Sequence, residues 1–244
     1  MHHELWFTAL LNQYFAAPAE WILSLGGYHS EHGKPWSNGH AMLVLAAIIV
    51  MLAAAFLRTR LSADRPGNFQ LLIENVYTFL DDQAREIIGH GYKRYVPFFA
   101  TTFMFILFCN LMGVVPGHES PTMYYTIPAG FAIATFLNYN IHGFREMGVV
   151  KYLGHFAGPM WWLAWFMFPL EIISHCIRPV SLTIRLFANM FAGEEVTLGF
   201  MGIVPYVVPV VFLGLHVFVS FIQAFIFTVL SAAYVGGAVA HEEH

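Results

Sequence analysis

Long apolar runs separated by short polar segments dominate the chain. Residues 41–57 are unbroken apolar and end at a basic group, Arg58, Arg60 and Arg65. Further apolar runs cover residues 95–115, 124–142 and 206–238. A helix needs roughly 17–25 mostly apolar residues to cross the hydrocarbon core of a bilayer. The pattern therefore predicts an all-α membrane protein with spanning helices at these positions.

Residues 69–88 follow a different pattern. Apolar residues recur at steps of three and four, and acidic and basic residues occupy much of the remaining surface. Such a segment is typical of an amphipathic helix that lies along a membrane surface. The alternative is a small soluble subdomain, which we disfavour because the sequence offers no second soluble helix for it to pack against.

Residues 160–199 are apolar for about twice the length of an upright crossing, yet they carry several ionisable groups. They form either two spans with a turn near Arg178–Pro179 or one long, steeply tilted helix. The residues alone favour two spans, because proline is a helix breaker. Proline is also tolerated inside membrane helices, so the single helix stays open.

The placement of Lys and Arg predicts the topology. Most of the 11 basic residues follow the first and third spans, whereas the N-terminal 38 residues carry only Lys34. By the positive-inside rule, the loops after these two spans face the cytoplasm. If residues 160–199 form one helix, the chain has five spans, with its N-terminus outside and its C-terminus in the cytoplasm.

Composition supports a membrane protein and excludes other classes. Hydrophobic residues make up 58% of the chain and charged residues only 11%, whereas an average soluble domain is about 25% charged. This excludes a soluble enzyme, a nucleic-acid-binding module and a disordered scaffold. The N-terminus has no basic start typical of a signal peptide, so we expect it to be retained.

Charged groups within the apolar stretch are the strongest chemical signal. Each costs roughly 2.5–3.5 kcal/mol at the centre of a membrane helix, so such groups are usually functional. Glu171, Arg178 and Arg185 are spaced by seven and share one helix face, and Ser181 and Asn189 flank Arg185 by four residues. Arg178 and Glu171 can form a simple structural ion pair. Arginine is the side chain that stays charged when it is desolvated.

Arg185 has no acidic residue three, four or seven positions downstream, and Glu194 lies nine residues further on. Its counter-charge must therefore come from elsewhere, and a carboxylate on another subunit is the simplest source. In the last span, His216 and Gln223 share a face with Ser220 between them. Together with Glu194 and Asn189, they predict a hydrated proton path. Plain interhelical hydrogen bonds are the alternative for each residue.

These residues carry a resemblance to a known family. Residues 169–171 (PLE) and 178–194 (RPVSLTIRLFANMFAGE) resemble the signature of subunit a of the F-type ATP synthase. His216 with the segment 221–227 (FIQAFIF) is similar to its last helix, and Asn110-Leu111-Met112 to its second span. The likeness covers most of residues 40–244 and is most specific around Arg185.

The resemblance implies one membrane domain over residues 1–244. It would have an N-terminal extracytoplasmic segment at 1–38, five spanning helices and a surface helix at 69–88. The last two spans, within 160–238, would form a long tilted hairpin against a c-ring. That favours the single helix at Pro179. The implied partners are the c-ring, peripheral-stalk b subunits and lipid, with no nucleic acid, nucleotide, cofactor or metal.

The resemblance also implies the roles of individual residues. Arg185 matches the essential arginine, which serves as a charge barrier and as partner of the c-ring carboxylate. The proton path would comprise Asn110, Asn189, Glu194, His216, Gln223, Glu171 and Ser181. Gly113 stands where some members have an acidic residue, so an acid at that point must come from Glu119 or His118. The chain would be a non-catalytic, proton-translocating subunit in a bacterial plasma membrane.

Two rival classes predict different features. A secondary transporter acting alone would show inverted repeats and broken helices, and no internal repeat is visible. An intramembrane metalloenzyme or haem protein is suggested by the 13 histidines. The zinc-protease helix motif, with its two histidines four residues apart, does not occur.

Overall fold

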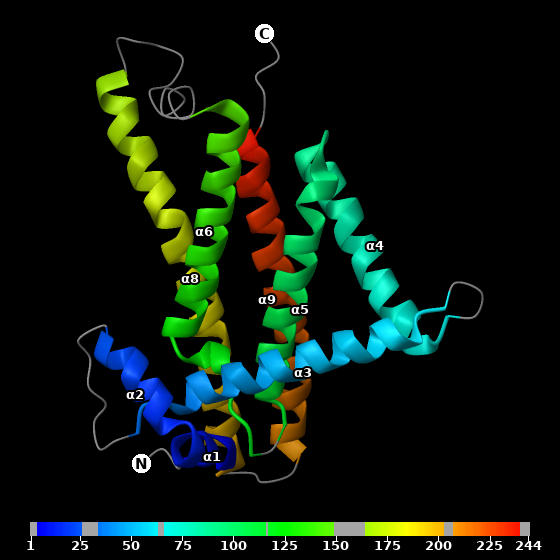
Figure 1. Cartoon of the computed structure of the whole chain (residues 1–244), viewed down its shortest axis with the longest axis vertical. Coiled ribbons are helices and arrows are strands. Elements are labelled where there is room, and N and C mark those ends of the chain that lie inside the picture. Colours follow the sequence, from blue (N-terminus) through cyan, green and yellow to red (C-terminus); the bar gives the residue numbers. More distant parts are fainter. Residues whose placement is uncertain are drawn as a thin grey trace. The chain divides into compact units, whose positions relative to one another are not determined.

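The computed structural model describes residues 4–25, 34–62, 66–115, 117–148, 164–202 and 207–239. Within these residues the fold is entirely helical (Figure 1), with eight α-helices and two short 3-10 turns, η2 (Tyr92–Arg94) and η3 (Pro121–Met123). The helices are α1 (Trp6–Tyr14), α2 (Ala16–Leu25), α3 (Asn38–Arg60), α4 (Asn68–Ile88), α5 (Val96–Met112), α6 (Thr126–Met147), α8 (Ala164–Met201) and α9 (Val207–Val239). The all-α prediction is confirmed.

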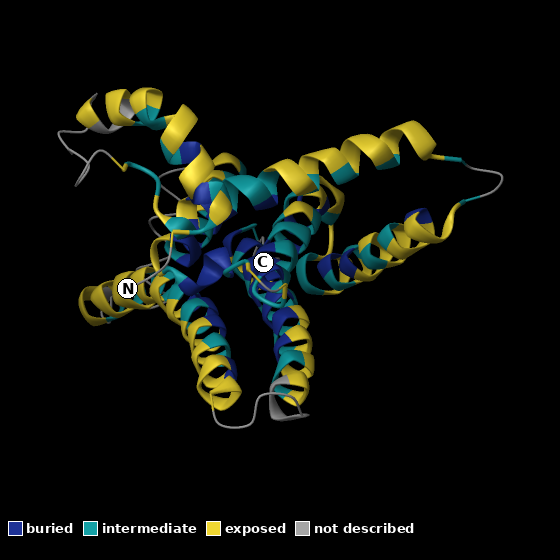
Figure 2. Ribbon diagram, turned by 90° about the horizontal axis from the view of Figure 1, so that it is seen from below, coloured by how far each residue is buried: buried dark blue, intermediate teal, exposed yellow. Residues whose placement is uncertain are grey.

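The apolar runs of the sequence become long helices with mostly apolar surfaces. Helix α3 and the Val210–Val239 part of α9 are long and apolar enough to cross a membrane, and α5 is a shorter apolar helix. Met51, Leu52 and Phe56 of α3 each expose more than half of their surface. Exposed residues extend along most of the long helices (Figure 2). Contiguous exposed apolar surface of this extent indicates contact with lipid.

Helix α4 matches the predicted amphipathic segment. It begins after Gly67 and ends at Gly89, whose φ of 75° is the left-handed conformation that glycine adopts easily. The Gly89 N–H donates to the carbonyl of Arg85 and closes the last turn. Leu80 and Ala84 are buried, whereas Leu72 is exposed. The helix thus keeps part of its apolar stripe uncovered.

Helix α8 corrects one expectation from the residues alone. It runs unbroken for 38 residues and contains both Pro169 and Pro179, so the turn expected near Pro179 is wrong. Each proline removes one main-chain donor. A turn in an apolar environment would leave more main-chain groups unpaired, each at a cost of several kcal/mol. Continuation of the helix is therefore the less costly solution.

The chain divides into two compact units. The first comprises Met1–Arg60, Phe105–Ile127 and Phe187–Phe221, and the second comprises Leu61–Met104, Pro128–Leu186 and Ile222–His244. The core of the second unit is an aromatic and aliphatic cluster that includes Tyr95, Val96, Phe99, Tyr139, Ala232 and Val235. Buried side chains of the first unit include Ala41, Met42, Ala46, Ile106, Cys109 and Met190.

Helices α1 and α2 form a part of the first unit that the hydrophobic pattern did not predict. Asn12 of α1 accepts a hydrogen bond from the main-chain N–H of Trp36 at 3.0 Å, and its amide donates to the Trp36 carbonyl at 3.2 Å. The Leu5 N–H donates to the Asn38 side chain at 3.3 Å. Reciprocal bonds of this kind tie the N-terminal helix to the start of α3.

Candidate functional site

A buried group of amide and hydroxyl side chains lies in the first unit. We call it the hydroxyl–amide cluster, and its members, all fully buried, are Asn110, Ser120, Thr122 and Ser220. Thr122 Oγ1 donates to Asn110 Oδ1 at 2.6 Å, and Asn110 Nδ2 donates to the Ser220 carbonyl at 3.3 Å. Ser120 Oγ donates to the Cys109 carbonyl at 3.0 Å and lies 2.7 Å from Thr122 Oγ1. Ser120 and Thr122 have one hydroxyl proton each, but their hydroxyl groups make three short contacts. The hydrogen bonds of the cluster can therefore rearrange.

The segment between α5 and α6 places Ser120 and Thr122 beside Asn110, which lies in the last turn of α5. Gly117 turns the chain with a φ of 81°, and Ser120 packs against Gly113. A Cβ on residue 113 would lie 3.0 Å from the Ser120 Cβ. A side chain at residue 113 would therefore require Ser120 to shift by a few tenths of an ångström.

Glu119 is one of the two residues expected to stand in for the acid that is missing at Gly113. Tyr124 Oη donates to Glu119 Oε2 at 2.5 Å, and the Glu119 carboxylate interacts electrostatically with Glu194. Burial, together with this hydrogen bond, raises the pKa of Tyr124 above its ordinary value of 10.0. The other candidate, His118, lies edge-on to the Trp6 ring, with 6.1 Å between ring centroids.

Glu194 on α8 and His216 on α9 adjoin the hydroxyl–amide cluster. Glu194 interacts with the main-chain N–H of Ser120, and His216 interacts with the main-chain carbonyl of Asn110. Glu194 Oε2 and His216 Nε2 are buried and have no hydrogen-bond partner among the described residues. A buried open polar atom needs water or a transferred proton to satisfy it. Both side chains are titratable, and each leaves one polar atom open at this point of the first unit.

The close approach of α8 and α9 at this point depends on Gly193. A Cβ on residue 193 would lie 3.0 Å from His216 Nδ1. One turn of α9 further on, Ser220 Oγ lies 4.0 Å from Met190 Sδ of α8. The glycine lets the imidazole reach the helix that carries Glu194.

The structure places the remaining predicted path residues differently. Asn189 belongs to the first unit and is exposed on α8. Gln223, 2% exposed, belongs to the second unit, as do the exposed Ser181 and the half-buried Glu171. Asn110, Glu194 and His216 of the predicted path meet in one cluster of the first unit. Ser120 and Thr122 were missed, because isolated loop residues carry no periodic signal.

The two membrane arginines of the second unit differ in their partners. Arg178 Nη2 lies 3.6 Å from Glu171 Oε1, and its guanidinium lies 5.3 Å from the centroid of the Tyr234 ring. The structure thus contains the Arg178–Glu171 ion pair that the sequence suggested. Arg185 is half-buried, and no carboxylate among the described residues of its unit lies within 4.0 Å of it. The expected counter-charge on another subunit stays a prediction.

The second unit also holds a polar group to which the sequence assigned no role. His175 Nε2 lies 3.0 Å from Asn140 Oδ1 and 3.4 Å from Tyr139 Oη, and its ring meets the ring of Phe136 edge-on. Tyr139 in turn packs on Tyr234, with 5.8 Å between ring centroids. We call these residues, Phe136, Tyr139, Asn140, His175 and Tyr234, the aromatic–histidine cluster. No group of three or more metal-ligating side chains occurs within the described ranges.

Comparison with known proteins identifies the class and the family. The family model "ATP synthase A chain" matches residues 40–236. The ATP synthase subunit a of Solibacter usitatus (strain Ellin6076) is 52% identical over 233 residues, which cover 96% of this chain and 100% of the relative. The protein of the same name from Koribacter versatilis (strain Ellin345) is 47% identical over 242 residues, 99% of both chains. That of Sulfurimonas denitrificans is 38% identical over 214 residues, 87% of this chain and 95% of the relative.

The fold defines an all-helical membrane protein, and its first unit contains a group of buried polar side chains. The chain belongs to the family of ATP synthase subunit a, the proton-conducting stator subunit of the Fo sector. It is accordingly a non-catalytic, proton-translocating membrane subunit of a bacterial ATP synthase complex. This membership replaces the two rival classes, the transporter acting alone and the intramembrane metalloenzyme.

Proposed function

We propose that the chain provides two proton half-channels that lead to carboxylates on a c-ring, with Arg185 between them. The inlet path would use Asn110, Asn189, Glu194, His216 and Gln223. The outlet path would use Glu171 and Ser181. Proton flow through both would drive rotation of the ring and, through it, ATP synthesis in a peripheral catalytic domain.

The observation that carries this proposal is the unpaired state of Arg185. Its half-buried guanidinium has no carboxylate within 4.0 Å among the described residues of its unit, whereas Arg178 in the same unit has Glu171 and Tyr234. Because arginine cannot lose its proton in a protein, the charge requires compensation. A carboxylate that arrives on a neighbouring subunit supplies it.

The same charge explains how the two half-channels stay separate. A proton that reaches a c-ring carboxylate from Glu194 or His216 neutralises it, and the neutral acid can then face lipid at little cost. Beside Arg185 the ionised carboxylate is favoured, so the proton leaves through the outlet path. A fixed positive charge also repels a proton that would cross directly. Each elementary charge moved across the membrane supplies about 2.3 kcal/mol per 100 mV.

The proposed arrangement treats residues 1–244 as one membrane domain. Helices α3, α5, α6, α8 and α9 would cross the bilayer and α4 would lie on its surface. Helices α8 and α9 would form a tilted hairpin against the c-ring, and peripheral-stalk b subunits would bind elsewhere. The excess of Lys and Arg after the first and third spans supports an external N-terminus and a cytoplasmic C-terminus in the bacterial plasma membrane.

The decisive experiment compares Arg185→Ala with Arg178→Ala in the assembled complex in membrane vesicles. We expect Arg185→Ala to reduce ATP-driven proton pumping to background and to raise passive proton leak, because the charge barrier is gone. Arg178→Ala should retain coupled pumping without a raised leak, because its charge is already paired with Glu171. A fluorescent pH-gradient dye measures both quantities. Coupled pumping by the Arg185→Ala complex would refute the barrier role.

A further inference from the structure

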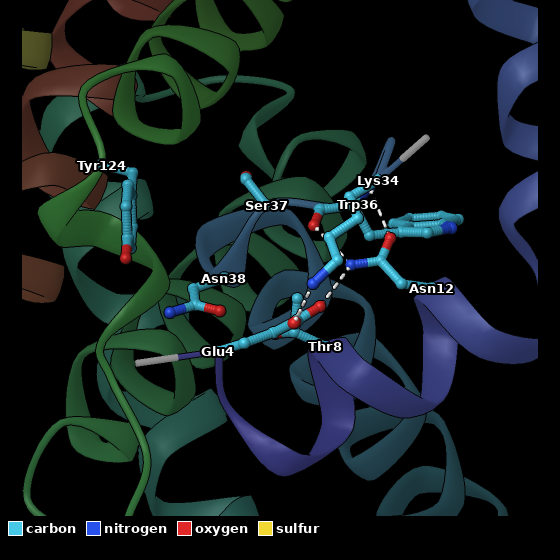
Figure 3. A pocket seen from close by; sticks show the side chains of 8 residues that line it. All are labelled: Glu4, Thr8, Asn12, Lys34, Trp36, Ser37, Asn38 and Tyr124. Atoms are coloured by element: carbon cyan, nitrogen blue, oxygen red, sulfur yellow. Dashed lines mark hydrogen bonds and ion pairs between the residues drawn. The ribbon is translucent and has the colours of Figure 1, made fainter. Parts of the chain in front are cut away.

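The N-terminal part of the first unit contains a pocket lined by several polar side chains, none of which belongs to the proposed proton path. Its volume is about 380 Å³ (Figure 3), and the lining residues are Glu4, Thr8, Asn12, Lys34, Trp36, Ser37, Asn38 and Tyr124. Most of these residues precede residue 40, where the match to the family model begins. The family signature therefore gives this pocket no role.

One wall of the pocket is a network of charged and amide groups. Lys34 Nζ donates to Glu4 Oε2 at 2.6 Å, and Asn12 Nδ2 donates to Glu4 Oε1 at 2.8 Å. Asn12 also accepts from the Trp36 N–H, which links the network to the start of α3. Because these bonds join segments about 30 residues apart in the sequence, they hold the pocket in a defined shape.

Tyr124 lines the pocket apart from that network (Figure 3). Its hydroxyl donates to Glu119 at 2.5 Å and interacts with the Asn38 side chain. Gly39 makes room for the ring, since a Cβ on residue 39 would lie 2.5 Å from Tyr124 Cδ2. The tyrosine thus connects the pocket with Glu119, which interacts electrostatically with Glu194.

Thr8 provides a separate indication that the pocket holds water. The residue is only 1% exposed, it lines the pocket, and its Oγ1 has no hydrogen-bond partner in the part of the chain that the structure describes. A buried hydroxyl without a protein partner is normally satisfied by an ordered water molecule. The pocket is large enough to hold water, and Glu4, Asn12 and Lys34 supply polar groups on its wall.

We propose that this pocket is the water-filled outer vestibule of the inlet path and that it delivers hydronium to Glu119 through Tyr124. The proposal rests on the proposed function and extends it to the N-terminal helix. In the transfer, hydronium gives a proton to the Tyr124 phenol oxygen while the phenol proton passes to the Glu119 carboxylate. The products are water, an intact phenol and a neutral carboxylic acid, which passes its proton on to Glu194.

Thiol labelling tests whether the vestibule is open and used. The exposed Cys176 is replaced by Ser and the buried Cys109 is kept. Ser37→Cys then places a thiol on the pocket wall, and Gln13→Cys places a matched thiol on the exposed surface of α1. A membrane-impermeant methanethiosulfonate is added from the external side of the assembled complex. We expect it to slow ATP synthesis several-fold in Ser37→Cys and to leave Gln13→Cys unchanged.

Failure of Ser37→Cys to react from that side, or reaction without any loss of rate, would overturn the vestibule. The unlabelled Ser37→Cys complex is its own baseline, so a folding effect of the substitution does not confuse the result.

The relay step has its own test in Tyr124→Phe and Glu119→Gln. Phe keeps the ring that packs over Gly39 but lacks the hydroxyl. We expect ATP synthesis at alkaline external pH to fall several-fold in both variants and to recover toward the unmodified rate as external pH falls, because hydronium becomes abundant. A merely structural role would lower the rate equally at every pH, and that outcome would refute the relay. If Glu194→Gln slows ATP synthesis while Tyr124→Phe and Glu119→Gln do not, the vestibule proposal is refuted and the proposed function is still supported.

Discussion

Both units contain buried polar atoms that have no hydrogen-bond partner among the described residues, and in the second unit these belong to Tyr95, Thr135 and Asn138. The two units differ in how their histidine and charged side chains within the long helices are partnered. In the first unit, Glu194 Oε2 and His216 Nε2 have no partner among the described residues. In the second, His175 contacts Asn140 and Tyr139, and Arg178 has a carboxylate partner, Glu171. A group with an open polar atom can exchange a proton with water, and a paired group is held in one state.

The contrast between the two histidines shows how their surroundings produce this difference. His216 is approached by Gly193 and by the main-chain carbonyl of Asn110. His175 is enclosed by the rings of Phe136 and Tyr139, with 5.0 and 5.2 Å between ring centroids. Edge-to-face aromatic contacts fix an imidazole in place and add about 0.5–1.5 kcal/mol beyond the buried area. The same residue type is thus left with an open ring nitrogen in one unit and is packed among aromatic rings in the other.

Substitution of the two histidines should give the largest effect that tests this difference between the units. We expect His216→Ala to slow proton uptake by about 100-fold or more, the loss typical of a removed proton-transfer group, without opening a leak. Glu194→Gln should behave in the same way. His175→Ala should lower the thermal stability of the complex while coupled pumping continues. ATP-driven pumping and passive leak, measured in the same vesicles, check each outcome. Full synthesis rates in both first-unit variants would remove Glu194 and His216 from the path.

A smaller effect is expected from glycine substitutions, one in each unit. In Gly193→Ala the new Cβ would lie 3.0 Å from His216 Nδ1, so the imidazole must move by a few tenths of an ångström. We expect proton uptake to slow a few-fold with little change in stability. In Gly236→Ala the Cβ would lie 3.2 Å from the Ile87 carbonyl oxygen, which cannot turn away because it belongs to the main chain. That variant should lose about 1–3 kcal/mol through overpacking.

Gly214→Ala is the matched control for both glycine variants, because nothing lies within 4 Å of its added Cβ. It should be neutral or slightly stabilising, since alanine is the better helix former by up to about 1 kcal/mol. Thermal unfolding and initial pumping rates separate the two kinds of effect. Equal losses of pumping in Gly193→Ala and Gly236→Ala would contradict the contrast between the units.

The helices were predictable because their signal is periodic and long. The apolar runs gave α3, α5, α6 and α9 to within a few residues, and the three- and four-residue spacing gave α4. The break at Pro179 was the wrong expectation from the residues alone, because local propensity favours a turn there. The apolar surroundings of α8 outweigh that preference, since they leave no water for unpaired main-chain groups.

The candidate site was predictable only where a charge stood out against an apolar background. Glu194 and His216 are conspicuous within their helices, whereas Ser120 and Thr122 look like ordinary loop residues. Their importance follows from the turn at Gly117, which brings them to Asn110. The pocket around Thr8 and Tyr124 joins segments more than 100 residues apart. No local pattern encodes contacts of that kind.

The smallest predicted effect concerns the exposed ion pairs of the two units. Lys34 and Glu4 of the first unit, and Arg94 and Glu146 of the second, each have an N–O distance of 2.6 Å. Lys34→Met should cost about 0.2–1 kcal/mol, as is usual for an exposed pair. Arg94→Met should cost more, because its guanidinium also lies 4.8 Å from the centroid of the Tyr95 ring.

Lowering the pH should remove the stability that the Lys34–Glu4 pair gives to the first unit. The hydrogen bond from Lys34, followed by that from Asn12, lowers the pKa of Glu4 below its ordinary value of 4.5. A carboxylate whose pKa is lowered on folding stabilises the fold fully above its unfolded pKa, and the contribution disappears as pH falls through the lowered value. The thermal midpoints of the unmodified protein and of Lys34→Met should therefore differ at pH 7 and converge in acid. Midpoints that diverge as pH falls would show that Lys34 stabilises the N-terminal segment by something other than its pairing with ionised Glu4.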